Sequence, residues 1–382
     1  MTLTCEKSSE TELRDPLYAV VMAGGPGSRL WPESRPSRPK PFLPLAPDGR
    51  TLIAATLERF EPLVPRDRRF VVAARAMKEL FFETLPDFDA SRVLFEPAAR
   101  NTALCAAWGA LAVASFDPNA TMIVAPSDHW IGGEEALRRV LADAARLVEE
   151  DPTRLVTLGV EPTYPAECYG YVEKGGALGG AIEGYEVAQF REKPSRERAQ
   201  AFLETKRFYW NAGIFVWKAS RYLDLLKRFE PTLVETLETL EARVHICASE
   251  GRRVDEDAEF IDAFAKGKSV SIDYAVLERA SNVVLVPASS FEWNDVGTFA
   301  ELERVGATGT ASSAVVEVDG SGNYARIVGD AAGRKKVVAF SGVSDLLVVD
   351  AGDALLVAQK GDEEGMKRLV ARLKELGLYD LL

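Results

Sequence analysis

A short apolar run that leads into a glycine-rich, cationic turn constrains this chain more than any other stretch. Residues 18–22 are apolar, and three glycines follow within residues 24–27. The run predicts a buried strand, and the glycines predict a turn whose backbone can approach a bulky group. Backbone N–H groups in such a turn, with Arg29 and Lys40 close by, suit a polyphosphate. We therefore expect this loop to hold a nucleoside triphosphate.

The loop departs from two familiar phosphate-binding patterns. A Walker A loop needs a Gly-Lys pair that is not present here, and the dinucleotide fingerprint needs a third glycine where Leu30 stands. A tight turn with solvated cations is the simpler alternative, and glycines after a strand would favour it if taken alone. Four prolines between residues 32 and 41 fix the path of the segment near Arg29 and Lys40, which favours phosphate binding.

Length and composition bound the class of protein. A chain of 382 residues is too long for one small core, so we expect two domains or one large α/β domain with an appendage. Its 46 basic and 58 acidic residues give a net charge of −12, which argues against nucleic-acid and anionic-membrane partners. Four dispersed cysteines without CxxC spacing suggest reduced thiols, and no apolar run approaches the roughly 20 residues that span a bilayer. A soluble, cytoplasmic protein is expected.

The pattern of strands and helices predicts an α/β architecture. Strand and helix patterns alternate up to residue 160, which is typical of βαβ units and a mainly parallel, Rossmann-like sheet. Ligands bind beyond the carboxyl ends of such strands, which groups the loops at 24–29, 96–102 and 127–129 around one crevice. Strand patterns between residues 169 and 217 predict an antiparallel insertion beside that sheet. Further helical patterns follow, including one that Ser271 or Asp273 opens and that runs to Ala280.

Three segments follow from these patterns. Residues 1–14 are expected to form a flexible tail, and residues 15–305 the mixed, mainly parallel domain. Residues 306–382 are rich in Gly, Ala, Ser and Asp, with short β-rich runs and a final amphipathic helix at 362–376. They predict a small β-rich C-terminal domain ending in a helix, in which no sequence period is strong enough to indicate a repeat.

The signature segment resembles a known family. Gly24-Gly25-Pro26-Gly27-Ser28-Arg29-Leu30-Trp31-Pro32, with Arg35 and Pro39-Lys40-Pro41-Phe42, is similar to the signature of sugar nucleotidyltransferases, and its Trp-Pro and Ser-Arg pairs resemble the mannose-1-phosphate guanylyltransferase (GDP-mannose pyrophosphorylase) branch. Seven further matches follow in the family's order, between roughly residues 17 and 300: Glu96-Pro97 with Arg100-Asn101-Thr102, Pro126-Ser127-Asp128-His129, Tyr169-Gly170-Tyr171, Glu192-Lys193-Pro194, Trp210-Asn211-Ala212-Gly213, Ser271-Ile272-Asp273-Tyr274-Ala275 and Trp293-Asn294-Asp295-Val296-Gly297. The sequence departs from the family's usual residues at Ser28, Pro41, Ser127 and Ala212.

The resemblance implies a nucleotidyltransferase fold and a reaction. GTP and α-D-mannose 1-phosphate would give GDP-mannose and pyrophosphate, with Mg²⁺ as cofactor. The implied catalytic residues are Arg29 and Lys40 on the triphosphate and Lys193 on the sugar phosphate. The implied binding residues are Ala23, Gly24, Gly25, Gly27, Ser28, Glu96, Pro97, Asn101 and Thr102 for the nucleotide, Tyr169, Gly170, Glu192 and Asn211 for the sugar phosphate, and Asp128 and Asp295 for the metal.

Each of these residues also has a structural alternative. Asp128 and Asp295, each expected to follow an apolar strand, could cap helices or form turns, and Asn101 or Thr102 could cap the helix that begins there. The resemblance places Glu96 at the base, where a carboxylate can accept from guanine N1–H and N2 amine groups, and this favours guanine over thymine. His129 and the aromatic cluster between residues 208 and 217 are expected to be structural.

Two other functions stay open. The first is a related sugar nucleotidyltransferase that makes another GDP-hexose or a dTDP- or UDP-sugar. The second is a non-catalytic regulatory homologue, although the retained Arg29, Lys40, Asp128 and Asp295 argue against it. The resemblance also implies a β-helical segment with dimer contacts in the C-terminal region, so a homodimer remains one alternative for the assembly.

Overall fold

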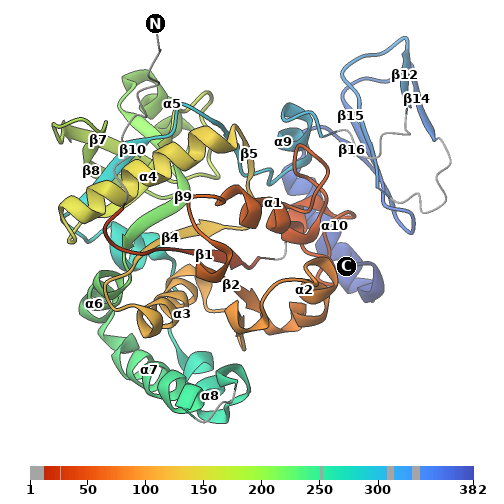
Figure 1. Ribbon diagram of the computed structural model, residues 1–382. Coiled ribbons are helices and arrows are strands. Elements are labelled where there is room, and N and C mark those ends of the chain that lie inside the picture. Colours follow the sequence, from red (N-terminus) through yellow and green to blue (C-terminus); the bar gives the residue numbers. More distant parts are fainter. Residues whose placement is uncertain (1–12, 26, 250–252, 308–313, 329–335) are drawn as a thin grey trace, which may run out of the picture.

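A mixed sheet forms the centre of the computed structural model, which describes residues 13–25, 27–249, 253–307, 314–328 and 336–382 (Figure 1). Within these residues the sheet has nine strands. In spatial order they are β3 (Val93–Glu96), β2 (Arg69–Ala74), β1 (Leu17–Ala23), β4 (Thr121–Pro126), β9 (Phe208–Lys218), β6 (Leu155–Val160), β10 (Val283–Pro287), β8 (Tyr185–Arg191) and β7 (Tyr171–Ala177). The predicted Rossmann-like, mixed α/β fold is confirmed.

Strand direction places the functional loops at one edge of the sheet. β3, β2, β1 and β4 pair in parallel, and β6 and β10 run the same way because β4 and β6 are both antiparallel to β9. The carboxyl ends of β1, β3 and β4 therefore lie along the same edge. The sequence predicted an antiparallel insertion beside the parallel part of the sheet. One strand of that insertion, β9, instead runs between β4 and β6. Its nearly continuous burial suits a central strand.

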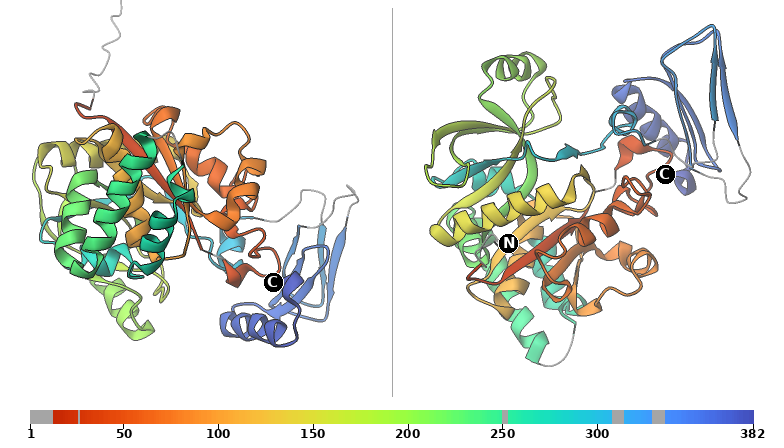
Figure 2. Two further views of the ribbon diagram at one scale, coloured as in Figure 1. Left: turned by 90° about the horizontal axis from the view of Figure 1, so that it is seen from below. Right: turned by 45° about the horizontal axis from the view of Figure 1, so that its top comes forward.

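Helices cover both faces of the sheet (Figure 2). Alternate side chains of β1 enter two different apolar clusters: Tyr18 and Val20 face one, and Ala19 and Val21 face the other. The first cluster is covered by α3 (Asn101–Phe116), α6 (Ala219–Phe229), α7 (Val234–Ser249) and α8 (Ala258–Lys266), and the second by α1 (Leu52–Arg59), α2 (Lys78–Thr84) and α4 (Glu134–Glu150). The other elements of this part of the chain are α5 (Arg196–Thr205), α9 (Phe299–Arg304), β5 (Trp130–Gly132) and β11 (Glu292–Asn294).

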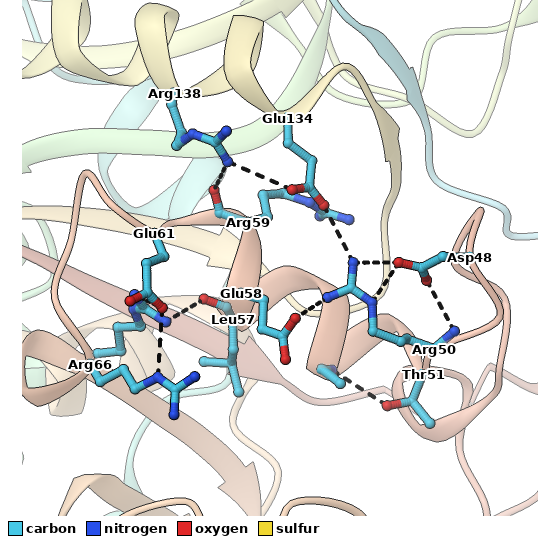
Figure 3. Close-up of polar contacts among 12 residues, drawn as sticks. Asp48, Arg50, Thr51, Leu57, Glu58, Arg59, Glu61, Arg66, Glu134 and Arg138 are labelled. Carbon is cyan, nitrogen blue, oxygen red and sulfur yellow. Dashed lines mark hydrogen bonds and ion pairs between the residues drawn. The ribbon is translucent and has the colours of Figure 1, made fainter.

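Ion pairs join the first helix to the fourth (Figure 3). Arg50 donates to Asp48 at 2.6 Å and pairs with Glu58 of α1, and it lies 3.6 Å from Glu134 of α4. Arg138 of α4 donates to the Arg59 carbonyl at 3.1 Å. These contacts fix α1, which follows the signature segment, against the helix that packs across the sheet.

One predicted helix is wrong in form. The segment expected to be helical from Ser271 or Asp273 to Ala280 contains a π-helical turn at Asp273–Leu277, closed by the Glu278 N–H donating to the Asp273 carbonyl at 2.9 Å. The chain then turns into β10, which leaves no room for a longer helix. π-turns often occur at functional sites, and this one places Asp273 beside β9.

The C-terminal residues form a short β-coil followed by a helix. The elements are β12 (Ala314–Val318), β13 (Tyr324–Ile327), β14 (Val337–Ser341), β15 (Leu346–Asp350), β16 (Leu355–Gln359) and α10 (Glu363–Glu375). The parallel pairs β12–β14 and β13–β15 both join residues 23 positions apart, for example Ala314 with Val337 and Tyr324 with Leu347. The coil therefore has a structural repeat that the sequence pattern did not reveal.

The C-terminal residues lie to one side of the central sheet (Figure 1). Most of the tail predicted at residues 1–14 lies outside the described residues, and the predicted boundary near residue 305 remains a prediction. Figure 1 shows β12–β16 projecting to one side of the sheet, with α10 close to α9. None of the helices in the described part of the chain is both long and apolar enough to cross a membrane.

Candidate active site

The signature loop starts where β1 ends. Gly25 and Gly27 have φ angles of 98° and 58°, a region that favours glycine. A methyl group at Gly27 would lie 2.8 Å from both Lys40 Cβ and Ser34 Oγ, so only glycine lets the loop pass this close. The Gly27 carbonyl accepts from Leu30 N–H at 3.0 Å and closes the 3₁₀ turn η1 (Ser28–Leu30).

Lys40 lies on a second 3₁₀ turn, η2 (Lys40–Phe42), whose second residue is Pro41. The N–H that proline lacks is one that has no partner at the start of a helix, so Pro41 costs no backbone hydrogen bond here. This accounts for the departure from the family's usual residue at that position. The Lys40 side chain is buried, and its Nζ donates to Asp128 Oδ2 at 2.9 Å and to the Asp295 carbonyl.

The two predicted metal ligands meet at Lys40 from different elements. Asp128 follows β4, as predicted. The expectation that Asp295 also follows an apolar strand is wrong, because it follows β11, a short strand outside the central sheet. β11 pairs with β5, and the register sets Asn294 opposite Trp130, which brings Asp295 to the same lysine as Asp128.

The electrostatics around Asp128 keep its carboxylate charged. Burial alone would raise the pKa of Asp128, but the charge of Lys40 and its hydrogen bond hold that pKa below its ordinary value. His129 is itself buried, which lowers its pKa to about 4. Its Nδ1 accepts from Trp293 Nε1–H at 3.1 Å, so the neutral imidazole has the structural contact that the sequence suggested.

These residues suit a divalent metal ion of the hard, oxygen-preferring kind. Asp128 and Asp295 supply carboxylate oxygens, and no group of three potential side-chain ligands occurs among the described residues. Mg²⁺ typically takes one or two carboxylates and completes its shell with substrate phosphates and waters. The donor set therefore fits an ion that binds together with a nucleotide.

Arg29 faces both the metal-ligand region and the C-terminal domain. A methyl group at Gly297 would lie 2.9 Å from Arg29 Nη2 and 3.1 Å from Asp295 Oδ2, so the guanidinium and the carboxylate flank the same glycine. Arg29 Nη1 lies 3.9 Å from Glu363 Oε2 at the start of α10. Arg29 also lines a cleft of about 480 Å³ between α9 and α10.

The predicted base pocket lies at the end of β3. Burial raises the pKa of Glu96 to about 7, and its Oε1 has no hydrogen-bond partner in the described structure. The predicted helix cap by Asn101 or Thr102 is wrong, since Arg100 takes the N-cap position of α3 without a side-chain bond. Asn101 has a φ of 62° and accepts from Thr102 N–H at 2.8 Å, while Thr102 Oγ1 accepts from Ile272 N–H at 3.0 Å.

The predicted sugar-phosphate residues lie together. The Gly170 carbonyl accepts from Asn211 N–H at 2.8 Å, and Lys193 N–H donates to the Tyr169 carbonyl at 3.2 Å. A methyl group at Gly170 would lie 2.6 Å from Glu192 Oε2. Lys193 Nζ lies 2.9 Å from Glu192 Oε1, and its side chain is largely exposed.

Two features of this region were not predicted. The hydroxyl of Tyr169 donates to Asp295 Oδ1 at 2.9 Å and so contacts a predicted metal ligand. Asn211 Nδ2 donates to Asp273 Oδ1 at 3.1 Å, and burial, together with the charge of Glu192, raises the pKa of Asp273 to about 7. The only sign of Asp273 in the sequence was its place in the motif at residues 271–275. Its contact with Asn211 joins segments that are distant in the sequence, so the motif could not predict it.

Comparison with known proteins identifies the class. The family model described as "Nucleotidyl transferase" matches residues 18–311, and that described as "MannoseP isomerase/GMP-like beta-helix domain" matches residues 314–373. Mannose-1-phosphate guanylyltransferase ManC of Salmonella typhimurium is 36% identical over 386 residues, covering 95% of this chain and 74% of its own length. Mannose-1-phosphate guanylyltransferase of Escherichia coli K12 is 35% identical over 380 residues, covering 95% and 75%.

A solved structure agrees with these relatives. A Thermus thermophilus protein, described as mannose-1-phosphate geranyltransferase, is 36% identical, with a TM-score of 0.80 over 94% of this chain and 99% of that one. The chain is thus an enzyme of the nucleotidyl transferase class, whose members generally use a divalent metal. Within that class it belongs to the family of mannose-1-phosphate guanylyltransferases.

Proposed function

We propose that this enzyme transfers GMP from GTP to α-D-mannose 1-phosphate and releases pyrophosphate. The observation that carries the proposal is the position of Lys40 Nζ, which contacts both Asp128 and the Asp295 backbone at the mouth of the glycine loop. This arrangement concentrates positive charge where a triphosphate would lie, beside two carboxylates suited to a metal ion. Both relatives named above are called mannose-1-phosphate guanylyltransferases, and this supports the choice of substrates.

The proposed chemistry needs no general base. A phosphate monoester has a second pKa near 6 and is already an oxyanion at neutral pH. A new bond forms between a sugar-phosphate oxygen and the α-phosphorus of GTP, and the bond from that phosphorus to the β-phosphate oxygen breaks. Lys193, with its exposed ammonium, aligns the attacking phosphate. His129, neutral and bonded to Trp293, takes no part in proton transfer.

Charge neutralisation is the main contribution of the protein. Lys40 and Arg29 stabilise the charge that develops on the departing pyrophosphate. Asp128 and Asp295 would hold Mg²⁺, which supplies Lewis-acid stabilisation of phosphate charge when bound. The nucleotide loop (Ala23, Gly24, Gly25, Gly27 and Ser28) would bind the phosphates through backbone N–H groups, with Glu96, Pro97, Asn101 and Thr102 at the guanine base.

The substrate panel tests this proposal. Pyrophosphate release is measured with GTP, ATP, UTP and dTTP against mannose, glucose and other hexose 1-phosphates. We expect the highest kcat/KM for GTP with mannose 1-phosphate. A preference for another pair would assign the chain to a related sugar nucleotidyltransferase, and no release with any pair would favour a regulatory homologue.

Lys40 provides a second test, at the level of the mechanism. Lys40→Ala removes the ammonium that contacts the Asp128 carboxylate and the Asp295 backbone carbonyl, so kcat should fall by about 10²–10³-fold, as for loss of one transition-state donor. Circular dichroism should show the wild-type spectrum. Near-normal turnover of a folded Lys40→Ala protein would contradict the mechanism.

We also propose three finer properties. Mg²⁺ is the metal, because the donor set consists of oxygens. The location is cytoplasmic, which the free thiols Cys105 and Cys168 suit. The chain forms a homodimer through β12 and β14, where Val315, Val316 and Val337 are about half exposed or more. Metal titration of activity, fractionation and light scattering test these points in turn.

A further inference from the structure

The C-terminal domain packs on the signature segment itself, not only on the outside of the sheet. α10 contacts η1, the turn that carries Arg29. One apolar cluster unites Leu30 and Trp31 of the signature segment with Tyr324 and Leu347 of the C-terminal coil and Met366 of α10. Figure 1 and the right-hand view of Figure 2 both show α10 close to the red segment that follows β1.

A buried ion pair fastens the two parts together. Arg326 of β13 donates through Nε to Glu33 Oε2 at 2.5 Å and through Nη2 to Glu33 Oε1 at 2.7 Å. The side chains of Glu33 and Arg326 are only 1% and 3% exposed. Desolvation makes a buried pair a poor device for stability, whereas its bidentate geometry fixes position and orientation.

Two more side chains, one on each side of Glu33 in the sequence, also bond to the C-terminal domain. Trp31 Nε1–H donates to the Leu381 carbonyl at 2.6 Å. Arg35 donates through both terminal nitrogens to Asp353, at 2.6 and 2.5 Å. Three side chains spaced at residues 31, 33 and 35 thus reach three different parts of the C-terminal domain.

The attachment is linked directly to the phosphate-binding residues. The N–H groups of Glu33 and Ser34 both donate to the Leu30 carbonyl, at 2.9 and 3.0 Å, and so tie Glu33 to the turn that carries Arg29. A methyl group at Gly27 would touch both Ser34 and Lys40. A shift of Glu33 would therefore displace the segment that holds Arg29 and packs against Lys40.

We propose that the C-terminal domain is a working part of the nucleotide site, with Arg326 as a positioning residue that acts through Glu33. Arg326 does not touch substrate; it sets where the signature segment lies, and so where Arg29 and Lys40 meet the triphosphate. This inference rests on the proposed GTP-dependent reaction. It requires that loss of the pair affects the nucleotide and the chemical step, and leaves the sugar-phosphate site largely unchanged.

The test uses full-length variants and steady-state kinetics with both substrates. Arg326→Gln alone leaves the Glu33 charge buried and can fail to fold, so the paired variant Glu33→Gln with Arg326→Gln removes both charges together. The paired variant should lose about 10²-fold in kcat/KM for GTP, the scale expected for a small misplacement of catalytic groups. Its KM for mannose 1-phosphate should stay within about twofold, because Lys193 contacts Glu192 and the Tyr169 carbonyl, which lie in other parts of the chain.

Two further variants separate positioning from general stability. Arg326→Lys keeps the positive charge but cannot donate to both Glu33 oxygens in the same bidentate way. It should therefore retain part of the kcat/KM for GTP that the paired variant loses. Lys218→Gln is the matched control, because Lys218 is also buried and joins distant segments through Asp15 at 2.6 Å, but at the opposite edge of the sheet. It should lower the melting temperature without changing the KM for GTP.

The outcomes are distinguishable. A folded paired variant with wild-type kcat and KM for GTP would overturn the positioning role, as would equal losses for GTP and mannose 1-phosphate. GTP binding measured by calorimetry without the second substrate should weaken in the paired variant. If the wild-type enzyme released no pyrophosphate, the proposed function would fail instead, whereas the calorimetric comparison would still report on the segment.

Discussion

At the scale of single residues, Tyr169 links two parts of the candidate site. Its carbonyl accepts from the backbone of Lys193, whereas its hydroxyl donates to Asp295. Burial and the charge of Asp295 raise the pKa of its phenol, so the hydroxyl stays a donor. The same residue therefore orients a candidate metal ligand and supports the candidate sugar-phosphate region.

Removing the Tyr169 hydroxyl should weaken metal binding. Partners that orient metal ligands typically contribute 10–100-fold to metal affinity, so Tyr169→Phe should raise the Mg²⁺ concentration for half-maximal activity by about tenfold. Direct Mn²⁺ binding, followed by electron paramagnetic resonance, should weaken in parallel. Tyr185→Phe is the control, because the Tyr185 hydroxyl donates to Glu183 at a distance of 3.0 Å, and neither residue belongs to the candidate site. An unchanged Mn²⁺ affinity in Tyr169→Phe would disprove the role.

Glu96 should make stability fall as the pH rises. Burial raises its pKa from 4.5 to about 7 in the folded state. Below pH 4.5 the carboxyl is protonated in both states; between pH 4.5 and 7 only the unfolded chain loses the proton, so the contribution to stability is lost across that window. The shift corresponds to at most about 3 kcal/mol.

Urea unfolding at pH 5 and pH 8 measures this effect. The loss of unfolding free energy between the two pH values should be smaller in Glu96→Gln by about 1–3 kcal/mol. Glu135→Gln, an exposed position on α4, should behave like the wild type. Equal pH dependence in Glu96→Gln and the wild type would show that the carboxyl is not held protonated by burial.

At the scale of elements, short paired segments and close packing decide where the site residues lie. The β5–β11 ribbon brings Asp295 to Asp128 although the two are distant in the sequence. Beneath the site, α3 lies so close to β1 that a methyl group at Gly109 would be 2.4 Å from Val20 Cγ1. The spacing of this helix and strand supports the loops that begin at their ends.

The close packing of α3 on β1 predicts that a glycine-to-alanine substitution in this helix lowers the free energy of unfolding. Alanine is favoured over glycine within a helix by about 1 kcal/mol, yet Gly109→Ala should destabilise the protein by about 1–3 kcal/mol because of overpacking. Urea denaturation measures the change. In a double-mutant cycle, Val20→Ala should relieve part of this cost, giving a favourable coupling of at least about 0.5 kcal/mol. A more stable Gly109→Ala protein would refute the close approach.

At the scale of the whole molecule, the two domains share a core. The cluster that joins Leu30 and Trp31 to Leu347 and Met366 also contains Phe299 of α9. A shared apolar core and a buried ion pair mean that neither part can unfold without exposing surface of the other. The C-terminal domain is therefore expected to unfold with the catalytic domain.

This coupling should appear as a single unfolding transition. All six tryptophans lie between residues 31 and 293, and of these Trp31 also bonds to the C-terminal domain, so their fluorescence follows mainly the catalytic domain. Hydrogen exchange of β15 follows the C-terminal domain. Both should report the same free energy of unfolding within about 1 kcal/mol. A separate, earlier transition of β15 would show that the domains are independent.

The sequence alone predicted the sheet and the glycine turn, because periodicity and turn residues act over a few neighbouring positions. The order of the site motifs came from the resemblance to a known family. Even Pro41, unexplained by its motif, became intelligible once its 3₁₀ turn was known. Only the tertiary structure decided that β9 enters the sheet, that Tyr169 holds Asp295 and that Arg326 meets Glu33, 293 positions away. These contacts depend on how distant segments converge, and no local pattern records which charge will face which partner.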